Sequence, residues 1–207
     1  MFVITEINST VVIQPKDFNK KVDEVCKYEL NRKLANKILH NVGLCLYIHE
    51  IVFIGDALVK PTDGYVCTQV VFRVVVFRPE LGSILTGTVR KCERNGIYVS
   101  LGFFDDIFIP ENKLQFPSRY DEVENVWVWQ YSVGNDETHD LFIDEGEKIK
   151  LRVVDEYFFE HEPVGSSEEI QQEQEPSYII IGSINECGLG LDAWWNQAAN
   201  NENDEEY

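Results

Sequence analysis

The sequence predicts an α+β protein in which an amino-terminal α+β domain, residues 1–79, precedes a mainly antiparallel β barrel, residues 80–195. Near the amino terminus, one segment with helical spacing of apolar residues lies between stretches of strand character. After Pro79, short apolar strands alternate with glycine and asparagine turns, as is typical of small barrels. We therefore expect one helix packed on a sheet in the first domain and mostly strands in the second.

The first domain is expected to open with a strand from Phe2 to Ile13, before Pro15. Apolar residues then recur at three- and four-residue spacing from Phe18 to Ile38, which indicates a helix with one apolar face. Pro15 and Asp17 favour the start of this helix, and Asn41–Gly43 favours its end.

Two longer strands complete the first domain. The run from Leu44 to Ile54 is apolar on both faces of a strand, so we expect it to aggregate unless a partner covers it. A turn at residues 60–64 separates this run from a long strand, Tyr65–Arg78. We place the domain boundary at Pro79, where that strand ends.

The first three barrel strands are predicted between Gly82 and Pro110. Asn95–Gly96 is a strong signal for a two-residue hairpin turn between the first two strands. The return strand Ile97–Leu101 is followed by a third apolar run, Ile107–Ile109. Three short strands joined by tight turns indicate one wall of a small barrel.

The remaining barrel strands are expected after an irregular segment, residues 115–139. Strand pieces follow at residues 141–143 and 147–154, the second alternating regularly between charged and apolar residues. Tyr178–Ile184 supplies a closing strand. The barrel thus ends shortly before Trp194 and Trp195.

An acidic insert and an acidic tail are expected to be disordered. The insert, near residues 160–177, holds few apolar groups, and ordering it would cost roughly 1–2 kcal/mol of backbone entropy per residue. We expect it to be dispensable for folding. Residues 196–207 form the tail.

The negative charge is concentrated at the carboxy-terminal end. All 18 Lys and Arg residues lie in residues 1–152, against 22 Asp and Glu residues, whereas 14 acidic residues and no basic one follow Arg152. An acidic protein would ordinarily bind nucleic acid poorly, because its charge repels the phosphates. Here that repulsion concerns the carboxy-terminal end of the chain, since the first barrel strands are locally basic.

The barrel strands carry aromatic and basic residues together. They resemble the RNA-binding OB repeat first known from a ribosomal protein, in which bases stack on exposed rings and a basic rim follows the phosphates, at roughly 1–3 kcal/mol per stacked base. Tyr98 lies at the usual exposed aromatic position. The candidate RNA-binding residues are Arg90, Lys91, Arg94, Tyr98 and Phe103.

The alternative interpretation is that the aromatic residues only fill the barrel core. We favour that interpretation for Phe104 and Phe108, because large aromatic side chains are mostly buried. For Tyr98 both interpretations stay open at this point.

The sequence gives little support for metal binding, catalysis, disulfide bonds or a membrane span. His139 with its acidic neighbours is the only local cluster that could bind a metal, and a solvated loop explains it equally well. Adjacent residues of an extended segment point to opposite faces, so Asp105 and Asp106 are interpreted as turn residues and not as paired catalytic carboxylates. Five widely spaced cysteines without a CxxC pair are expected to be buried thiols in a reducing compartment. No signal peptide and no membrane span are expected.

Several blocks, in order and spacing, resemble the larger stalk subunit of RNA polymerases, and within that group the RNA polymerase III form. The phenylalanine pair, the Asp-Asp pair and the terminal Trp-Trp pair favour the polymerase III branch. The blocks are Met1–Ile4, Asn31–Ile38, Asn41–Cys45, Phe72–Pro79, Gly96–Ile107 and Gly182–Trp195.

The resemblance implies a non-catalytic, nuclear subunit with a truncated RNP-like tip domain and an OB barrel, and with no cofactor. It implies three kinds of partner: a smaller stalk subunit, the RNA polymerase III core that the tip anchors to, and nascent single-stranded RNA or initiation factors beside the barrel. The products would be small RNAs such as transfer RNA. Two alternatives remain: a free-standing OB-fold RNA-binding protein of translation or RNA processing, and a nuclease accessory enzyme, which would require a metal cluster.

Overall fold

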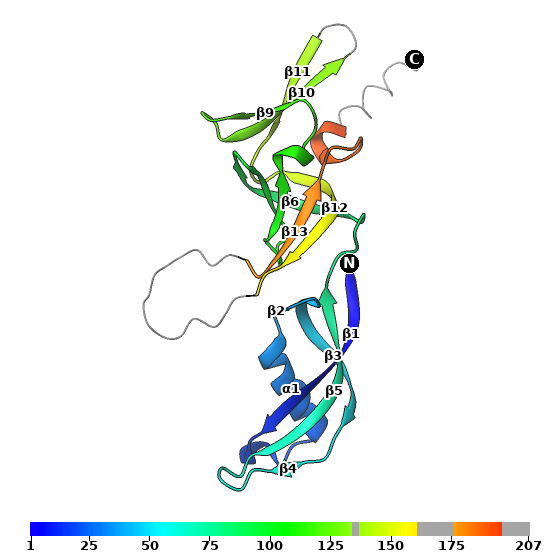
Figure 1. The fold of residues 1–207 in the computed structure, drawn as a ribbon, viewed down its shortest axis with the longest axis vertical. Helices are drawn as coiled ribbons and strands as arrows, with labels where there is room; N and C mark the ends of the chain where they lie inside the picture. The colour runs from blue at the N-terminus through cyan, green and yellow to red at the C-terminus, as the bar shows by residue number, and fades with distance from the viewer. Residues whose placement is uncertain (134–136, 161–175, 196–207) are drawn as a thin grey trace, which may run out of the picture. The chain divides into compact units, whose positions relative to one another are not determined.

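The computed structural model describes residues 1–133, 137–160 and 176–195 (Figure 1). Most of the expected acidic insert and all of the expected tail lie outside the described residues. The chain divides after Pro79 into two units, each with its own buried core.

The amino-terminal unit contains one antiparallel sheet of long strands rich in β-branched residues, which favour pleated, packed surfaces. β5 (Val66–Phe77) is central, with β1 (Phe2–Ile13) along one side and β3 (Gly43–Ile54) along the other. β2 (Lys37–Leu39) pairs with β3, and β4 (Leu58–Val59) pairs with the start of β5. Successive residues of β5 alternate between the two faces of this sheet.

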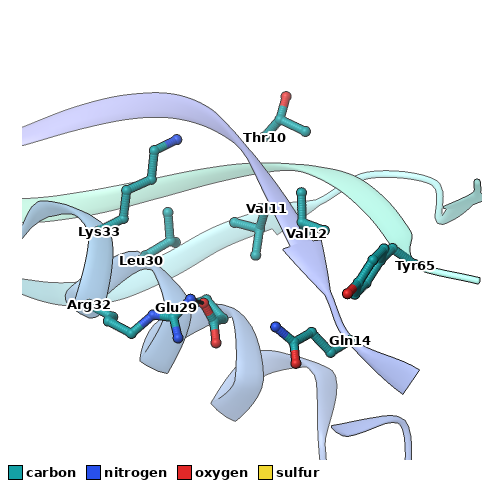
Figure 2. A pocket seen from close by; sticks show the side chains of 9 residues that line it. All are labelled: Thr10, Val11, Val12, Gln14, Glu29, Leu30, Arg32, Lys33 and Tyr65. Carbon is teal, nitrogen blue, oxygen red and sulfur yellow. Dashed lines mark ion pairs between the residues drawn. The ribbon is translucent and has the colours of Figure 1, made fainter. Parts of the chain in front are cut away.

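α1 (Val22–Leu34) covers the face formed by the even-numbered residues of β5 (Figure 1). Cys26 and Leu30 of α1 and Phe72 and Val74 of β5 are fully buried there. Each large apolar side chain buried in this way stabilises the fold by about 1.5–3 kcal/mol. On the β1 side, α1 and β1 border a hollow (Figure 2).

The helix is shorter at both ends than the sequence predicts. η1 (Pro15–Asp17) is a separate turn of 3-10 helix, so Phe18 lies outside α1 and is exposed. At the other end Asn36 adopts a left-handed φ of 57°, and Ile38 pairs with Leu44 in the sheet. None of the helices in the described part of the chain is long and apolar enough to cross a membrane.

The second unit is built on a closed five-stranded barrel. β6 (Ile84–Glu93), β7 (Gly96–Ser100) and β8 (Ile107–Pro110) are consecutive antiparallel neighbours. β12 (Lys148–Phe158) pairs antiparallel with β6, and β13 (Tyr178–Ser183) closes the barrel by pairing antiparallel with β12 and parallel with β8. This strand order is that of an OB barrel, and the predicted α+β fold class is confirmed.

A three-stranded sheet lies between the third and fourth barrel strands, where the sequence predicted an irregular segment. β9 (Ser118–Asp121), β10 (Val126–Val133) and β11 (Glu137–Ile143) form this sheet, with β10 in the middle. η2 (Glu111–Lys113) precedes it. The prediction was wrong here because aromatic and other apolar residues adjoin each other along β10, which obscures the alternation of a half-buried strand.

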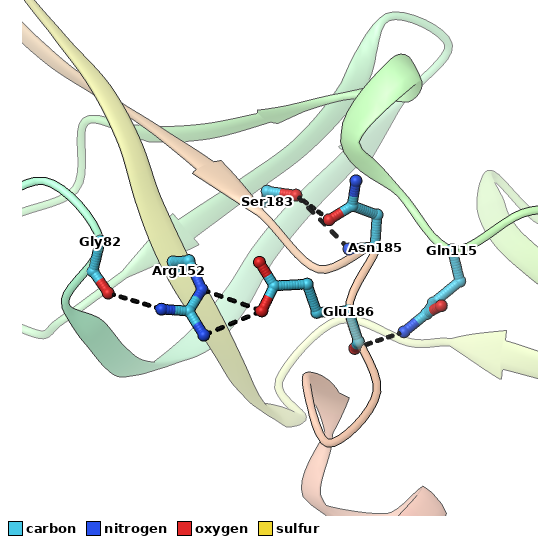
Figure 3. Close-up of polar contacts among 6 residues, drawn as sticks. All are labelled: Gly82, Gln115, Arg152, Ser183, Asn185 and Glu186. Carbon is cyan, nitrogen blue, oxygen red and sulfur yellow. Dashed lines mark hydrogen bonds and ion pairs between the residues drawn. The ribbon is translucent and has the colours of Figure 1, made fainter.

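Polar contacts fix the loop after β13 to the barrel (Figure 3). Arg152 donates through Nε and Nη2 to Glu186 Oε2 at 3.1 and 2.8 Å, and through Nη1 to Gly82 O at 2.9 Å. Gln115 Nε2 donates to the Glu186 carbonyl oxygen at 3.1 Å. The loop is thereby positioned for β14 (Gly190–Leu191), which pairs with β12.

Candidate nucleic-acid interface

Three residues from three neighbouring strands lie in one row on the outer face of the barrel. Lys91 of β6 is the register partner of Tyr98 of β7, which is the register partner of Phe108 of β8. The ring centroids of Tyr98 and Phe108 are 4.9 Å apart, within the range of a favourable aromatic pair. Both rings are half-buried, so the row presents ring surface beside an exposed ammonium group.

A β-bulge places two consecutive basic residues on this outer face. The β6–β7 register shifts between Val89 and Lys91, so Arg90 is the extra residue. Val89 and Cys92 remain buried, while Arg90 and Lys91 are both exposed. In an unbulged strand, one of the two basic side chains would point into the barrel.

Each of the three candidate basic side chains lies beside an acidic one. The pairs are Arg90–Asp105 and Arg94–Glu122, with 3.6 Å between their charged atoms, and Lys91–Glu93. All three basic side chains are more than half exposed, and such surface pairs contribute only about 0–1 kcal/mol. A phosphate group could therefore replace a carboxylate partner at small cost.

The candidate residues do not all lie together. Arg94 is in the turn between β6 and β7, whereas Phe103 is in the connection between β7 and β8, so the two flank opposite ends of β7. Phe103 is 44% exposed. The structure thus brings Arg90, Lys91 and Tyr98 together and leaves Arg94 and Phe103 at the margins of the face.

Phe108 is a member of the row that the sequence analysis assigned to the core. It is half-buried and alternates with the fully buried Ile107 and Ile109 along β8, which places its ring on the outer face. This alternation was the signal that could have identified it. Phe104, in contrast, is buried, and its ring lies 5.5 Å from that of Tyr178.

The β7–β8 connection is ordered by one polar cluster. Ser100 Oγ donates to Asp105 Oδ1 and accepts from Gly102 N at 2.9 Å. Burial, and secondarily the negative charge of Asp105, raise the pKa of the Asp106 carboxyl, which Arg90 opposes. Asp105 and Asp106 are connection residues, as the sequence analysis interpreted them.

We expect Asp106→Asn to stabilise the chain at neutral pH and not in acid. A carboxyl whose pKa is raised on folding stabilises the folded state below its usual pKa of 3.8, and this contribution is lost as the pH rises through the raised pKa. The amide removes the charge, so the melting temperature should rise by about 2 °C at pH 7 and be unchanged near pH 3. The control is Asp105→Ala, which removes both the acceptor of the Ser100 hydrogen bond and the charge beside Arg90, and it should lower the melting temperature. A gain at pH 3 as large as at pH 7 would contradict the burial argument.

No group of three or more His, Cys, Asp and Glu residues that could hold a metal ion is found among the described residues. Asp136, part of the cluster considered around His139, lies outside them. The five cysteines are unpaired thiols. The prediction that all are buried was wrong, because Cys187 is exposed in the loop after β13 and Cys67 is only partly buried. Burial raises the pKa of Cys92 to about 11. That thiol therefore stays protonated at physiological pH.

The amino-terminal sheet and the barrel each match a known family. Residues 9–64 match the SHS2 domain found in the N terminus of Rpb7p/Rpc25p. The class of protein is therefore a two-domain stalk subunit of an RNA polymerase. Residues 83–195 match RNA polymerase III subunit Rpc25. The chain belongs to the Rpc25 family of RNA polymerase III subunits, and the resemblance predicted from the sequence is confirmed.

Individual relatives are similar in sequence to most or nearly all of the chain. DNA-directed RNA polymerase III subunit RPC8 of Bos taurus is 47% identical over 203 residues, which cover 94% of this chain and 98% of the relative. The subunit of the same name from Saccharomyces cerevisiae is 39% identical, over 94% of this chain and 100% of the relative. The archaeal RNA polymerase subunit Rpo7 of Saccharolobus solfataricus is 25% identical, over 74% of this chain and 82% of the relative.

Proposed function

We propose that this chain is a non-catalytic subunit of the RNA polymerase III stalk, acting in the nucleus. In this function residues 1–79 form the tip domain, which anchors the chain to the polymerase core and pairs with a smaller stalk subunit. Residues 80–195 form the barrel, which contacts nascent single-stranded RNA and takes part in initiation. The near full-length similarity to polymerase III subunits supports this over a free-standing OB-fold protein of translation or RNA processing.

The row of Lys91, Tyr98 and Phe108 carries the RNA part of the proposal. A base can stack on a ring while a neighbouring cation meets the phosphate, without reading a specific sequence. Arg90 and Arg94 extend the positive charge along the same hairpin, and Phe103 adds an exposed ring beyond β7. A subunit beside emerging transcripts of varied sequence needs this kind of binding.

Tyr98→Ala is expected to weaken binding of single-stranded RNA by roughly 1–3 kcal/mol, the value of one stacked base. The measurement is a titration of labelled RNA with the purified stalk heterodimer at several salt concentrations, with thermal melting alongside. Tyr28→Ala is the matched control, because Tyr28 is exposed on α1 and outside the barrel. It should leave RNA binding unchanged.

Replacing Arg90, Lys91 and Arg94 together with glutamine should act differently. Cations that bind phosphates release counterions, so the slope of log K against log salt should flatten by about 0.7 for each phosphate that is no longer bound, whereas Tyr98→Ala should leave the slope unchanged. If Tyr98→Ala unfolds the barrel and leaves the affinity of the folded fraction unchanged, the ring is a core residue and the RNA proposal fails.

The pairing proposal predicts that the chain is poorly soluble alone and soluble when co-expressed with the smaller stalk subunit. The sheet face opposite α1 carries Ile4 of β1, Tyr47 and Phe53 of β3, and Val75 of β5, by register. Ile4, Tyr47 and Phe53 are each more than half exposed. Arg73 pairs with Glu6 and Glu50 between these apolar residues on the same face, so the face is mixed. Exposed apolar side chains grouped around such a charged centre mark an interface or cause aggregation. Light scattering of both preparations measures the effect.

Replacing Tyr47 and Phe53 with serine provides the control, since it should improve the solubility of the chain alone and weaken co-purification. A chain that stays monomeric at high concentration without its partner would contradict the pairing proposal. Recovery of ribosomal proteins in place of polymerase subunits from cell extract would favour the free-standing alternative.

A further inference from the structure

β1 is the edge strand of the amino-terminal sheet. It is twelve residues long and, within the residues that the structure describes, pairs only with β5. A long edge with unpaired backbone groups is a template for another strand, and natural proteins usually shorten, bulge or cover such edges. The β1–β5 register runs from Phe2 to Ile13 without a bulge.

The ladder shows which backbone groups of β1 point outward. Arg78 N donates to Met1 O at 3.0 Å, so Met1 directs its carbonyl group toward β5. In an antiparallel strand, each residue directs its N–H and C=O groups to one side, and the side alternates from one residue to the next. The odd-numbered residues of β1 therefore form backbone hydrogen bonds with β5. The even-numbered residues from Ile4 to Val12 therefore present N–H and C=O groups at the free edge.

A groove lies between α1 and the carboxy-terminal end of this edge, residues 10–12 of β1 (Figure 2). Its volume is about 450 Å³. Val11 and Leu30 provide buried apolar surface, and Arg32 and Lys33 of α1 place positive charge along it. An edge strand beside a helix-lined groove can bind an extended peptide by strand addition, with backbone bonds giving affinity and the groove giving specificity.

We propose that β1 binds an extended acidic segment of a protein partner, which adds to the sheet as an antiparallel strand and directs alternate acidic side chains into the α1 groove. The site is separate from the RNA face of the barrel and does not depend on the polymerase assignment. The sheet would then continue from β1 into the partner.

The charges of the groove decide the chemistry of the partner. Arg32 Nη2 lies 2.8 Å from Glu29 Oε2, and Lys33 Nζ donates to Ser9 Oγ at 3.2 Å. The Arg32 side chain is 62% exposed although Glu29 is only 16% exposed, so the guanidinium group can still face an incoming carboxylate, and Lys33 has a neutral partner. Two cations against one carboxylate leave the groove positive, so it favours carboxylates in the incoming strand.

Strand geometry gives a sharp test with a synthetic probe. The probe is a labelled ten-residue peptide of alternating Glu and Val, titrated into the full chain. In an antiparallel pair, directly opposite residues lie on the same face of the sheet. Only the peptide residues opposite the even-numbered residues of β1, from Ile4 to Val12, form backbone hydrogen bonds with its free edge. Glutamates in the groove then direct their N–H groups away from β1, and valines direct theirs toward it. N-methylation of every valine should abolish binding, whereas N-methylation of every glutamate should not.

Variants of the chain test the same interactions from the other side. Arg32→Gln with Lys33→Gln should weaken probe binding about tenfold. Thr10→Pro removes an outward N–H that the fold does not use, so binding should be lost while the melting temperature stays close to that of the parent chain. Lys27→Gln, on the side of α1 that faces His49, is the control and should bind the probe normally.

Three outcomes would overturn the proposal. Equal binding of both methylated peptides would show attraction by charge alone, and loss with methyl-glutamate only would exclude the antiparallel arrangement. Dimerisation of the chain that Thr10→Pro abolishes would make a second copy the occupant. If probe binding is also lost when the smaller stalk subunit is bound, that subunit supplies the acidic segment, and the proposal stands.

Discussion

Replacing Gly96 with alanine is expected to lower the free energy of unfolding of the barrel by about 3 kcal/mol or more. Gly96 has a φ of 151°, in a region that other residues rarely adopt. A Cβ atom there would lie 2.2 Å from Ile109 O and 2.9 Å from the ring of Phe108. Backbone and ring would both have to move, which would break the β7–β8 ladder. Denaturant unfolding followed by circular dichroism measures the loss.

Gly102→Ala separates strain from collision. Gly102 also has a positive φ, of 85°, but a Cβ atom there meets nothing within 4 Å. This variant should cost only about 1 kcal/mol, the ordinary penalty for a left-handed non-glycine residue. If Gly96→Ala and Gly102→Ala lower the free energy of unfolding equally, the backbone around Gly96 moves to make room for the Cβ atom. The steric contact with β8 then contributes little.

The Gly96 hairpin shows which part of the fold the sequence can predict. The Asn-Gly signal predicts the hairpin, and the β6–β7 hairpin forms at that place. Its two turn residues are Arg94 and Asn95, however, and Gly96 is already the first residue of β7, opposite Glu93. The long strands β1, β3 and β5 were equally predictable, because apolar and β-branched residues predominate in each of them.

The end of α1 could not be predicted in the same way. Apolar spacing continues to Ile38, but Ile38 packs as part of β2 once Asn36 turns the chain. Whether such a residue ends in a helix or a strand depends on whether β3 is available to pair with it. That pairing is tertiary, and it overrides local periodicity.

The candidate site was predictable in composition but not in geometry. Tyr98 and the basic residues were found from the strand pattern, whereas the row with Phe108 depends on cross-strand register and on the bulge at Arg90. The pairing of Arg94 with Glu122 joins residues far apart in the sequence. Such ion pairs determine the net charge of the face. They cannot be predicted from one sequence, because the fold decides which residues become neighbours.

Trp127→Ala is expected to lower the free energy of unfolding of the second unit by about 3–5 kcal/mol, as for other buried tryptophans. Trp127 of β10 is buried, its Nε1 donates to Glu93 O of β6 at 2.8 Å, and its ring lies 5.5 Å from that of Tyr120. It therefore attaches the β9–β11 sheet to the barrel strand that carries Arg90 and Lys91. Hydrogen exchange should show that amides of β9–β11 lose protection first.

Trp127→Phe divides this effect into packing and hydrogen bonding. Phenylalanine keeps a large apolar ring but leaves Glu93 O without its donor, which should cost about 1 kcal/mol plus a small cavity. The nearby hydrogen bond from Cys92 Sγ to Ile143 O would persist and hold β11 against β6. If Trp127→Ala melts β9–β11 without changing the stability of β6–β8, the sheet is a separate cooperative unit, and the position of Glu122 beside Arg94 does not depend on barrel packing. If both lose stability together, the sheet is part of the barrel core, and changes in β10 will alter the charge balance of the proposed RNA face.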